Sequence, residues 1–584
     1  MKKRDSELKR IIKVASRCNL LFIPFDLESL KKIAASIYVL AQFFFSCHKT
    51  NIQPVGDGSP FVLKSFTVNG NSGRNNYYNL YGRPLVKFFF AGPIKQSTVN
   101  DAVQFRTLSG QPVPVAFSYD DDSTINVIPS LALPSLSAYT LTVTRTLQSQ
   151  LDSFLQSGIR LNLITAIDSS NKFPQISDSA LLTLIEQQTF RYFYDFGHPV
   201  SGLTRERNSS GDIVTTGGSG FGVMAILVGI QRNFITRAQG LSRIDSIVSF
   251  LTTKAQRFHG AFPHWMNGAT GATVPFSSND NGADLVETSY LLEGLLAARQ
   301  FFNGPDATEV DLRYNINQLW IAVEWNWFRQ NGQNVLYWHW SPNLDFIINM
   351  PIQGWNEAMI VYALAASAPI YSNRIPKAVY DSGWAQNRAM KNGNHFYNYI
   401  LPLGPAYGGP LFFAHYSFLG INPNNLSDNY ADYGMQNLNH ALINYTYCVN
   451  NPGQFNGYSA SVWGLTASDD NLKGYDAHSP TNDDGVITPT AAISSLPYTP
   501  SESMDAIRFF YYKLGDKLWG NYGFVDAFNL TNIWFADSFL AIDQGPEIVM
   551  IENYRSGLLW KLFMSCPEIK DGMKSLGFHS PNLN

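Results

Sequence analysis

The feature that most constrains the fold is a change in the spacing of apolar residues near position 178. From Asp178 onward, apolar side chains recur at helical spacing in nine segments, 180–196, 221–231, 236–256, 283–302, 312–328, 354–366, 434–449, 502–514 and 546–564. Between Pro60 and Arg145 they alternate in short runs, as in strands of a half-buried sheet. The sequence therefore predicts a multidomain chain, with a small all-β part before a large all-α part.

The strand pattern predicts a β-sandwich of about 85 residues. Its expected strands are 61–68, 85–90, 114–119, 124–128 and 139–144, and their order resembles bacterial immunoglobulin-like modules. We place this module at 60–146, a connection at 147–175, the helical domain at 176–570 and a tail at 571–584. The module contains no catalytic constellation, so we expect it to be a spacer or a packing partner.

The N-terminal segment 1–47 has the pattern of an export signal. An apolar run of about 13 residues follows two lysines, which is too short for a membrane span but suits a signal-peptide core. It ends in Ser46-Cys47, which resembles a bacterial lipoprotein signal with Cys47 as the lipidated residue. The alternative is a buried N-terminal helix. We expect an exported, lipid-anchored protein in the periplasm or at the cell surface, with a polar linker at 48–59.

The amino-acid composition indicates which class of molecule the protein binds. The net charge of −3 gives no basic footprint for nucleic acid. Charged residues make up only 15% and aromatic residues 14%, a balance that suits a carbohydrate cleft. The four cysteines show neither a disulfide framework nor zinc spacing, and Cys448 and Cys566 lie in apolar segments that predict buried thiols.

The segment 280–299 combines a helical pattern with an unusual set of acids. Asp280, Asp284 and Glu287 stand at i, i+4 and i+7, which predicts three carboxylates on one helix stripe with Asp280 at the cap. No Lys or Arg lies within a turn of them, so their repulsion costs stability unless a function uses it. The alternative is that the helix dipole alone favours acids in the first turn.

Other candidate residues gather in loops rich in aromatic, amide and carboxylate groups. The further cleft carboxylates are Glu357 and Asp543, and the substrate-binding candidates are His264, Trp265, Trp338, Trp340, Trp355, His415, Trp463, Asp469 and Asp470. Each acid has a structural alternative as a cap or first-turn residue, and each Trp has one as a core residue.

The sequence also argues against several other kinds of site. Five separated histidines (264, 339, 415, 440 and 478) lack metal spacing, so we expect no metal site and no cofactor. The glycine run 217–222 lacks the Lys and the preceding strand of a phosphate loop. A Gly-x-Ser-x-Gly nucleophile elbow is also absent.

The helical domain resembles the glucoamylase-like domain that includes the β-1,2-glucanases of glycoside hydrolase family 144. The resemblance covers about residues 176–570 and rests on the motifs at 220–225, 264–268, 280–288, 337–342, 354–357, 411–419, 463–470, 485–491 and 543–546. It implies an (α/α)6 toroid whose members cleave linear β-1,2-glucan with inversion. By the same resemblance, the essential acidic stripe corresponds to Asp280, Asp284 and Glu287, and Glu357 and Asp543 are cleft carboxylates.

We therefore expect an inverting β-1,2-glucanase, endo- or exo-acting, that works as a monomer on an oligo- or polysaccharide. Glu287 or Asp284 would lie nearest the scissile bond, and the resemblance does not settle which carboxylate is the acid. One alternative is a non-catalytic glycan-binding lipoprotein of an uptake system. Another is a hydrolase of the same fold that acts on a different glucan linkage.

Overall fold

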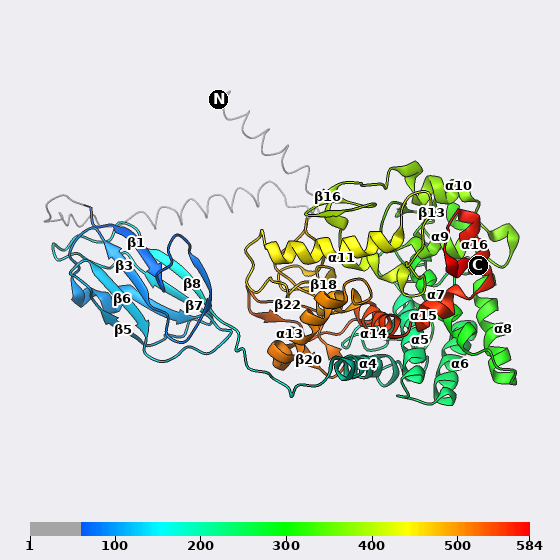
Figure 1. Ribbon diagram of the computed structural model, residues 1–584, viewed down its shortest axis with the longest axis horizontal. Helices are drawn as coiled ribbons and strands as arrows, with labels where there is room; N and C mark the ends of the chain where they lie inside the picture. The colour runs from blue at the N-terminus through cyan, green and yellow to red at the C-terminus, as the bar shows by residue number, and fades with distance from the viewer. Residues whose placement is uncertain (1–59) are drawn as a thin grey trace, which may run out of the picture.

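The computed structural model describes residues 60–584, which form a β-rich region followed by a helical region (Figure 1). The predicted signal segment at 1–47, its Cys47 and the linker at 48–59 lie outside the described residues.

The β-rich region consists of two four-stranded sheets around one hydrophobic core. The first sheet has the order β1-β3-β6-β5 and the second β2-β8-β7-β4. Their bounds are Leu63–Val68 (β1), Asn76–Leu80 (β2), Val86–Phe90 (β3), Val103–Thr107 (β4), Val115–Ser118 (β5), Thr124–Pro129 (β6), Ala138–Val143 (β7) and Ile159–Thr165 (β8). Alternate residues point inward, as along β3, where Val86, Phe88 and Phe90 are buried.

The five predicted strands are present, and three strands were missed. The expected end of this region at 146 is too early, because β8 lies within the segment taken as a connection and pairs with both β2 and β7. Its charged and amide residues, Arg160 and Asn162, face solvent and interrupt the apolar run. The actual connection is the short stretch between β8 and the first helix, and Lys172 in it donates its backbone N–H to Tyr512.

The helical region contains twelve main α-helices within residues 178–576. They are Asp178–Tyr194 (α4), Thr216–Gln231 (α5), Arg237–Thr253 (α6), Leu285–Phe301 (α7), Ala307–Ile321 (α8), Met359–Ala366 (α9), Tyr433–Asn450 (α11), Pro489–Ser494 (α12), Pro500–Leu518 (α13), Ala541–Arg555 (α14), Leu558–Met564 (α15) and Pro567–Leu576 (α16). The predicted segment 546–564 is two helices, because Gly557 adopts a left-handed φ of 69° between them.

The predicted tail at 571–584 is wrong, because these residues belong to the helical core. Met573 and Leu576 of α16 are buried, and so are Phe578 and Leu583 after it. This stretch contains too few apolar residues to show a helical period in the sequence, so its burial could not be predicted.

Helix α5 lies at the centre of the helical region and packs against α4, α6, α7 and α14. Its contact with α7 is unusually close. A Cβ at Gly220 would lie 2.1 Å from the carbonyl oxygen of Tyr290, and one at Gly294 would lie 2.1 Å from that of Gly220. Glycine at both positions therefore lets the two backbones touch, which fixes the N-terminal ends of α5 and α7 side by side.

Short strand pairs precede both of these helices. Strand β9 (Ile213–Thr215) leads into α5 and pairs with β10 (Trp265–Asn267), while β12 (Ala283–Asp284) leads into α7 and pairs with β14 (His339–Trp340). These pairs bring segments distant in sequence to one end of the two central helices.

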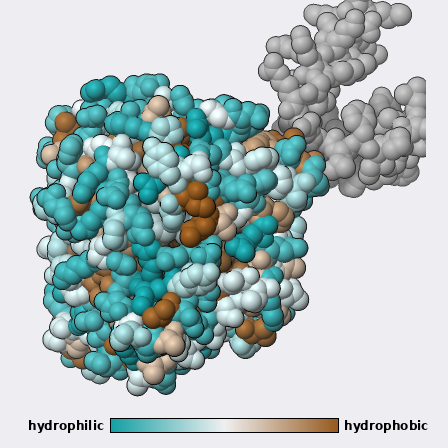
Figure 2. Space-filling model, turned by 90° about the vertical axis from the view of Figure 1, so that its right-hand side faces the viewer, coloured by the Kyte–Doolittle hydropathy of each residue, from teal (hydrophilic) through white to brown (hydrophobic). Residues whose placement is uncertain are grey.

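Among the helices of residues 60–584, none has both the length and the apolarity needed to cross a bilayer. The face of the molecule drawn in Figure 2 is mostly hydrophilic, with small and scattered hydrophobic patches. Cys448 and Cys566 are free, buried thiols, as their apolar segments predict.

Candidate active site

The acidic segment does not form the predicted helix stripe. Helix α7 begins at Leu285, and Asp284 is its N-cap, with Oδ1 accepting the N–H groups of Val286 (3.0 Å) and Glu287 (2.9 Å). Asp280 lies before the helix, in a turn where its N–H donates to the carbonyl of Ser277. The intervening residues pair with β14 as strand β12, so the helix starts later than the spacing suggests.

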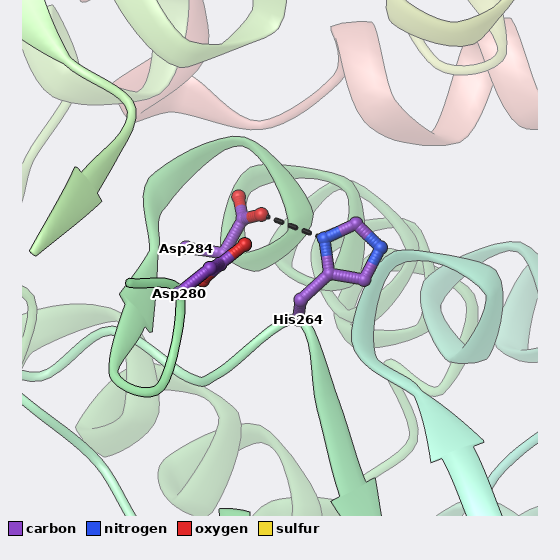
Figure 3. A group of neighbouring side chains, drawn as sticks. All are labelled: His264, Asp280 and Asp284. Atoms are coloured by element: carbon purple, nitrogen blue, oxygen red, sulfur yellow. Dashed lines mark hydrogen bonds and ion pairs between the residues drawn. The ribbon is translucent and has the colours of Figure 1, made fainter. Parts of the chain in front are cut away.

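Histidines supply the positive charge that the sequence around these acids lacks. His264 Nδ1 lies 2.9 Å from Asp284 Oδ2 (Figure 3). His339 Nδ1 lies 3.4 Å from Asp280 Oδ2 and 3.8 Å from Asp284 Oδ2. Two of the three carboxylates, those of Asp280 and Asp284, therefore meet two imidazoles, one on β14 and one on the residue before β10. We call Asp280, Asp284, His264 and His339 the entrance cluster.

The electrostatics of the entrance cluster favour imidazolium–carboxylate pairs. Burial alone would lower the pKa of His264, but the charge of Glu287 and the hydrogen bond to Asp284 outweigh it and raise the pKa to about 9. Burial would likewise raise the pKa of Asp284, yet the hydrogen bond from His264 and the charge of His339 lower it. At neutral pH, His264 is therefore protonated and Asp284 ionised.

Asp284 cannot lie nearest a scissile bond in this conformation. Its side chain has no exposed surface, and both oxygens are bonded, one to the backbone of α7 and one to His264. The prediction that Asp284 lies nearest the scissile bond is therefore wrong. Asp284 is a positioning residue, which holds His264 and the start of α7.

Glu287 and Glu357 are the carboxyl groups beside this cluster with raised pKa values. Glu287 Oε2 accepts the backbone N–H of Gly217 (2.7 Å) and the hydroxyl of Thr215 (3.2 Å) at the start of α5. Burial raises its pKa, and the charge of Asp284 adds to this. The glycine run 217–222 does follow a strand, β9, contrary to the prediction, and it binds a carboxylate rather than a phosphate. A side chain at Gly217 would clash there, since its Cβ would lie 2.8 Å from Glu287 Oε2.

Glu357 combines a near-neutral pKa with partial exposure. Burial raises its pKa to about 7, and the charges of Asp284 and Glu287 contribute to the shift. Its side chain is not fully buried, unlike that of Asp284. Tyr290 of α7 donates its hydroxyl to the backbone carbonyl of Glu357 (3.2 Å), which ties the two elements together. A carboxyl with this pKa can donate a proton near neutral pH.

A second group of carboxylates surrounds Asp543, in the first turn of α14. Asp469 binds Arg207 (Oδ1 to Nη1, 3.1 Å) and offers its N–H to Asp526 Oδ2 (2.7 Å). Burial raises the pKa of Asp526 to about 7, and burial together with the charge of Asp526 raises the pKa of Asp543 well above its ordinary value. Asp526 was missed, because no local motif surrounds it in the sequence.

Tyr416 connects the two groups. Burial raises the pKa of its hydroxyl, and the charges of both Asp543 and Glu357 add to that shift, so both carboxyl groups act on this phenol. Its ring contacts Tyr290, with centroids 5.7 Å apart. Two of the predicted carboxylates, Glu357 and Asp543, therefore both lie near Tyr416.

The aromatic candidates separate into two kinds. Trp265, Trp338 and Trp340 are partly exposed near the entrance cluster, and the ring of Trp265 lies 4.7 Å from that of Phe276. Such faces can stack on sugar rings. Their position agrees with a role in binding.

The predictions for Trp355 and Trp463 as stacking platforms are wrong, because both side chains lie in the core. Trp463 is fully buried and donates its Nε1–H to the carbonyl of Glu502. Trp355 is 4% exposed and packs on Tyr433. Sequence alone does not separate a Trp in a loop motif from one in the core.

His415 and Asp470 are likewise not available to a ligand in the cleft. Burial lowers the pKa of His415 to about 3, so the ring is neutral, and its Nε2 lies 3.0 Å from the Ser495 hydroxyl. Asp470 is 4% exposed and faces His478. The structure places both side chains within the packed interior.

Comparison with known proteins gives a consistent family assignment. Residues 349–567 match a family model described as "Putative glucoamylase". The chain is 45% identical over 430 residues to an exo β-1,2-glucooligosaccharide sophorohydrolase of Parabacteroides distasonis. That alignment covers 70% of this chain and 59% of the relative, so the chain spans less than two thirds of the relative's length.

Solved structures extend the likeness. An endo-β-1,2-glucanase of Chitinophaga pinensis, in complex with sophorotriose and glucose, is 52% identical, with a TM-score of 0.68, over 70% of this chain and 100% of that one. A β-1,2-glucanase of Parabacteroides distasonis is 37% identical, with a TM-score of 0.67, over 88% of this chain and 73% of that one. These matches confirm the resemblance seen in the motifs, and the chain belongs to the glucoamylase-like family that includes these β-1,2-glucanases.

Proposed function

We propose that the protein hydrolyses β-1,2-linked glucan by an inverting acid–base mechanism. The observation that carries the mechanism is Glu357, a partly exposed carboxyl with a pKa of about 7 beside ionised acids. The substrate is inferred from the relatives, whose names specify β-1,2-glucan or its oligosaccharides.

In this proposal, Glu357 is the general acid. An inverting enzyme needs one carboxylic acid to protonate the leaving oxygen and one carboxylate to activate water. Because Glu357 keeps its proton up to about pH 7, it can supply that proton under neutral conditions. Glu287 and Asp280 are the two candidates for the base, since Asp284 is fully buried.

The surrounding residues have supporting roles. Asp284 orients His264 through a hydrogen bond. The positive charge of the His264 imidazolium offsets the negative charge of Glu287 or Asp280, whichever of the two activates the water. Trp265, Trp338 and Trp340 provide faces for glucose rings. Asp469, which is partly exposed, grips sugar hydroxyls, whereas Asp543, which is only 4% exposed, acts through Asp526 beside it.

We also propose the finer architecture and the location of the protein. The helices of the large domain form an (α/α)6 toroid, and the two-sheet region is an immunoglobulin-like module. The protein is exported and lipid-anchored through Cys47, and it acts as a monomer. The support for export is the apolar run before Ser46-Cys47. Labelling with a radioactive fatty acid in cells carrying the chain or Cys47→Ser tests the anchor.

The substrate test uses purified protein with linear β-1,2-glucan and, separately, with starch. Products are separated by chromatography, and their initial anomeric form is read by proton NMR. The proposal predicts products from β-1,2-glucan only, with the α-anomer formed first because inversion converts a β-linkage. A ladder of products indicates endo action, and a single short product indicates exo action.

Three results would contradict the proposal. Products from starch alone would assign a different linkage. An initial β-anomer would assign retention. Binding of β-1,2-glucan without any product would indicate a glycan-binding protein, provided that the thermal unfolding curve shows a folded sample.

A further inference from the structure

A second cluster of histidine and aspartate lies in a hairpin and the loop after it. The hairpin is formed by β18 (Ala467–Asp470) and β19 (Gly474–Ala477). Asp470, His478 and Asp484 each place one nitrogen or oxygen so that these atoms all lie within 4.8 Å of one another. We call these three residues the hairpin cluster. They are separated from the entrance cluster, which contains none of them.

Two members of the hairpin cluster have buried polar atoms without a hydrogen-bond partner. His478 is fully buried, and neither ring nitrogen has a partner. Asp470 is 4% exposed; its Oδ1 accepts the N–H groups of Leu472 and Lys473, but its Oδ2 is unbonded and lies 3.4 Å from His478 Nε2. An orphaned buried nitrogen or carboxylate oxygen costs about 1–3 kcal/mol, so a partner for these atoms is expected.

The third member is held only by a weak ion pair. Lys473 Nζ lies 2.5 Å from Asp484 Oδ2 and the same distance from Asp476 Oδ2. The Lys473 side chain is 45% exposed, and ion pairs with an exposed partner are worth little. A divalent cation can therefore displace Lys473 from Asp484, and Lys473 keeps Asp476 as its partner.

The donor set selects the class of cation. Both ring nitrogens of His478 lack a hydrogen-bond partner, so one of them is free to bind a metal ion. One imidazole nitrogen with two carboxylates suits Zn²⁺ and similar transition ions, whereas Ca²⁺ and Mg²⁺ prefer oxygen ligands alone. We propose that Asp470, His478 and Asp484 form a binding site for a divalent transition cation of the Zn²⁺ class.

The position of the cluster suggests what the ion does. Asp469, the residue before Asp470, donates its N–H to Asp526 and pairs with Arg207 in the second carboxylate group. A cation that joins the hairpin to the loop at Asp484 holds this backbone in place. Its function is therefore structural.

The test measures zinc binding by the full chain after treatment with a chelator. Isothermal titration with ZnCl₂ and elemental analysis of dialysed protein should give one equivalent of Zn²⁺ per chain. The Tm should rise with Zn²⁺ concentration, because the ion binds only the folded site. Titrations with CaCl₂ and MgCl₂ should show at least about tenfold weaker binding.

Variants locate the site. His478→Gln and Asp484→Asn should each weaken Zn²⁺ binding at least about tenfold and remove the zinc-dependent rise in Tm. Asp484 is partly exposed, so its variant is expected to fold even if the buried His478→Gln variant does not. His395→Gln, at an exposed histidine outside both clusters, is the matched control and should bind as the parent does.

A further variant separates the two clusters. His264→Gln should retain the zinc equivalent, because His264 belongs to the entrance cluster. Loss of zinc in His264→Gln with retention in Asp484→Asn would overturn the proposal. The absence of a zinc equivalent in the folded parent chain, or binding of Ca²⁺ in preference to Zn²⁺, would also overturn it.

Discussion

The entrance cluster and the hairpin cluster contain the same residue types in opposite electrostatic states. In the entrance cluster, His264 is bonded to Asp284, and its pKa is raised to about 9. In the hairpin cluster, His478 is fully buried, has no hydrogen-bond partner and has a lowered pKa. The first cluster provides its own cation as an imidazolium, whereas the second has a neutral ring and needs a cation from outside.

This difference shows why residue type and spacing do not identify a metal site. His264, Asp280 and Asp284 also meet the distance requirement for a metal. His264 and Asp284 are nevertheless already joined by a hydrogen bond of 2.9 Å, while neither ring nitrogen of His478 nor Asp470 Oδ2 has a hydrogen-bond partner. The state of the imidazole, rather than its neighbours' identities, distinguishes a catalytic cluster from a metal-binding one.

The largest expected effect is on catalysis, at the carboxylate Glu287 beside the entrance cluster. Glu287→Gln should keep the fold, because an amide oxygen can still accept the N–H of Gly217, but it should lower kcat on β-1,2-glucan at least about 10²-fold. Glu324→Gln, at an exposed glutamate paired only with His259, is the matched control and should retain activity. Near-normal turnover in folded Glu287→Gln would remove this residue from the mechanism.

The next effect is on stability. His264→Gln leaves the Asp284 carboxylate buried without its imidazolium, although His339 lies 3.8 Å away. The free energy of unfolding at pH 7 should fall by about 2 kcal/mol, less than the ~3–5 kcal/mol for a fully buried pair, because His264 is partly exposed. Denaturant titration of both proteins measures the difference, and an unchanged midpoint would contradict the pairing.

The stability that the His264–Asp284 pair contributes should depend on pH. The pKa of His264 is raised from 6.5 to about 9, so its contribution to stability is complete below pH 6.5 and is lost as the pH rises through about 9. The gap in unfolding free energy between the parent and His264→Gln should therefore close across this interval. A gap that is constant from pH 6 to pH 10 would show that His264 is not charged in the folded state.

The smallest expected effect is on catalysis at the hairpin cluster. His478→Gln should change kcat on β-1,2-glucan less than about tenfold, well below the ~10²-fold of a proton-transfer group. Steady-state kinetics at 25 °C, in parallel with Glu287→Gln, checks this contrast. A loss as large as that of Glu287→Gln would place the hairpin cluster in the reaction itself.

Sequence reasoning predicted most helices because their apolar periodicity is local. It also predicted the carboxylates Asp280, Glu287, Glu357 and Asp543 from recognisable motifs, and their roles in a site stay predictions. The start of α7 was misplaced because the pairing of β12 with β14 depends on residues 55 positions apart, as in Asp284 and His339. Local spacing contains no information about such a partner.

The remaining errors have the same origin. Trp463 and Trp355 resemble cleft residues in sequence, but the packing of distant helices buries them. Asp526 reaches Asp543 only through the folded chain, so no motif marks it. Burial and long-range contact, which a single sequence does not encode locally, decide each of these cases.

The central claim is that Glu357 donates the proton in β-1,2-glucan hydrolysis. The most direct measurement is kcat/KM on linear β-1,2-glucan from pH 4 to pH 9 for the parent chain and for Glu357→Gln. The account predicts that the parent loses activity above pH 7 as Glu357 ionises, and that the variant is at least about 10²-fold slower without this limb. A folded variant with the parent's rate and the same alkaline limb would contradict it.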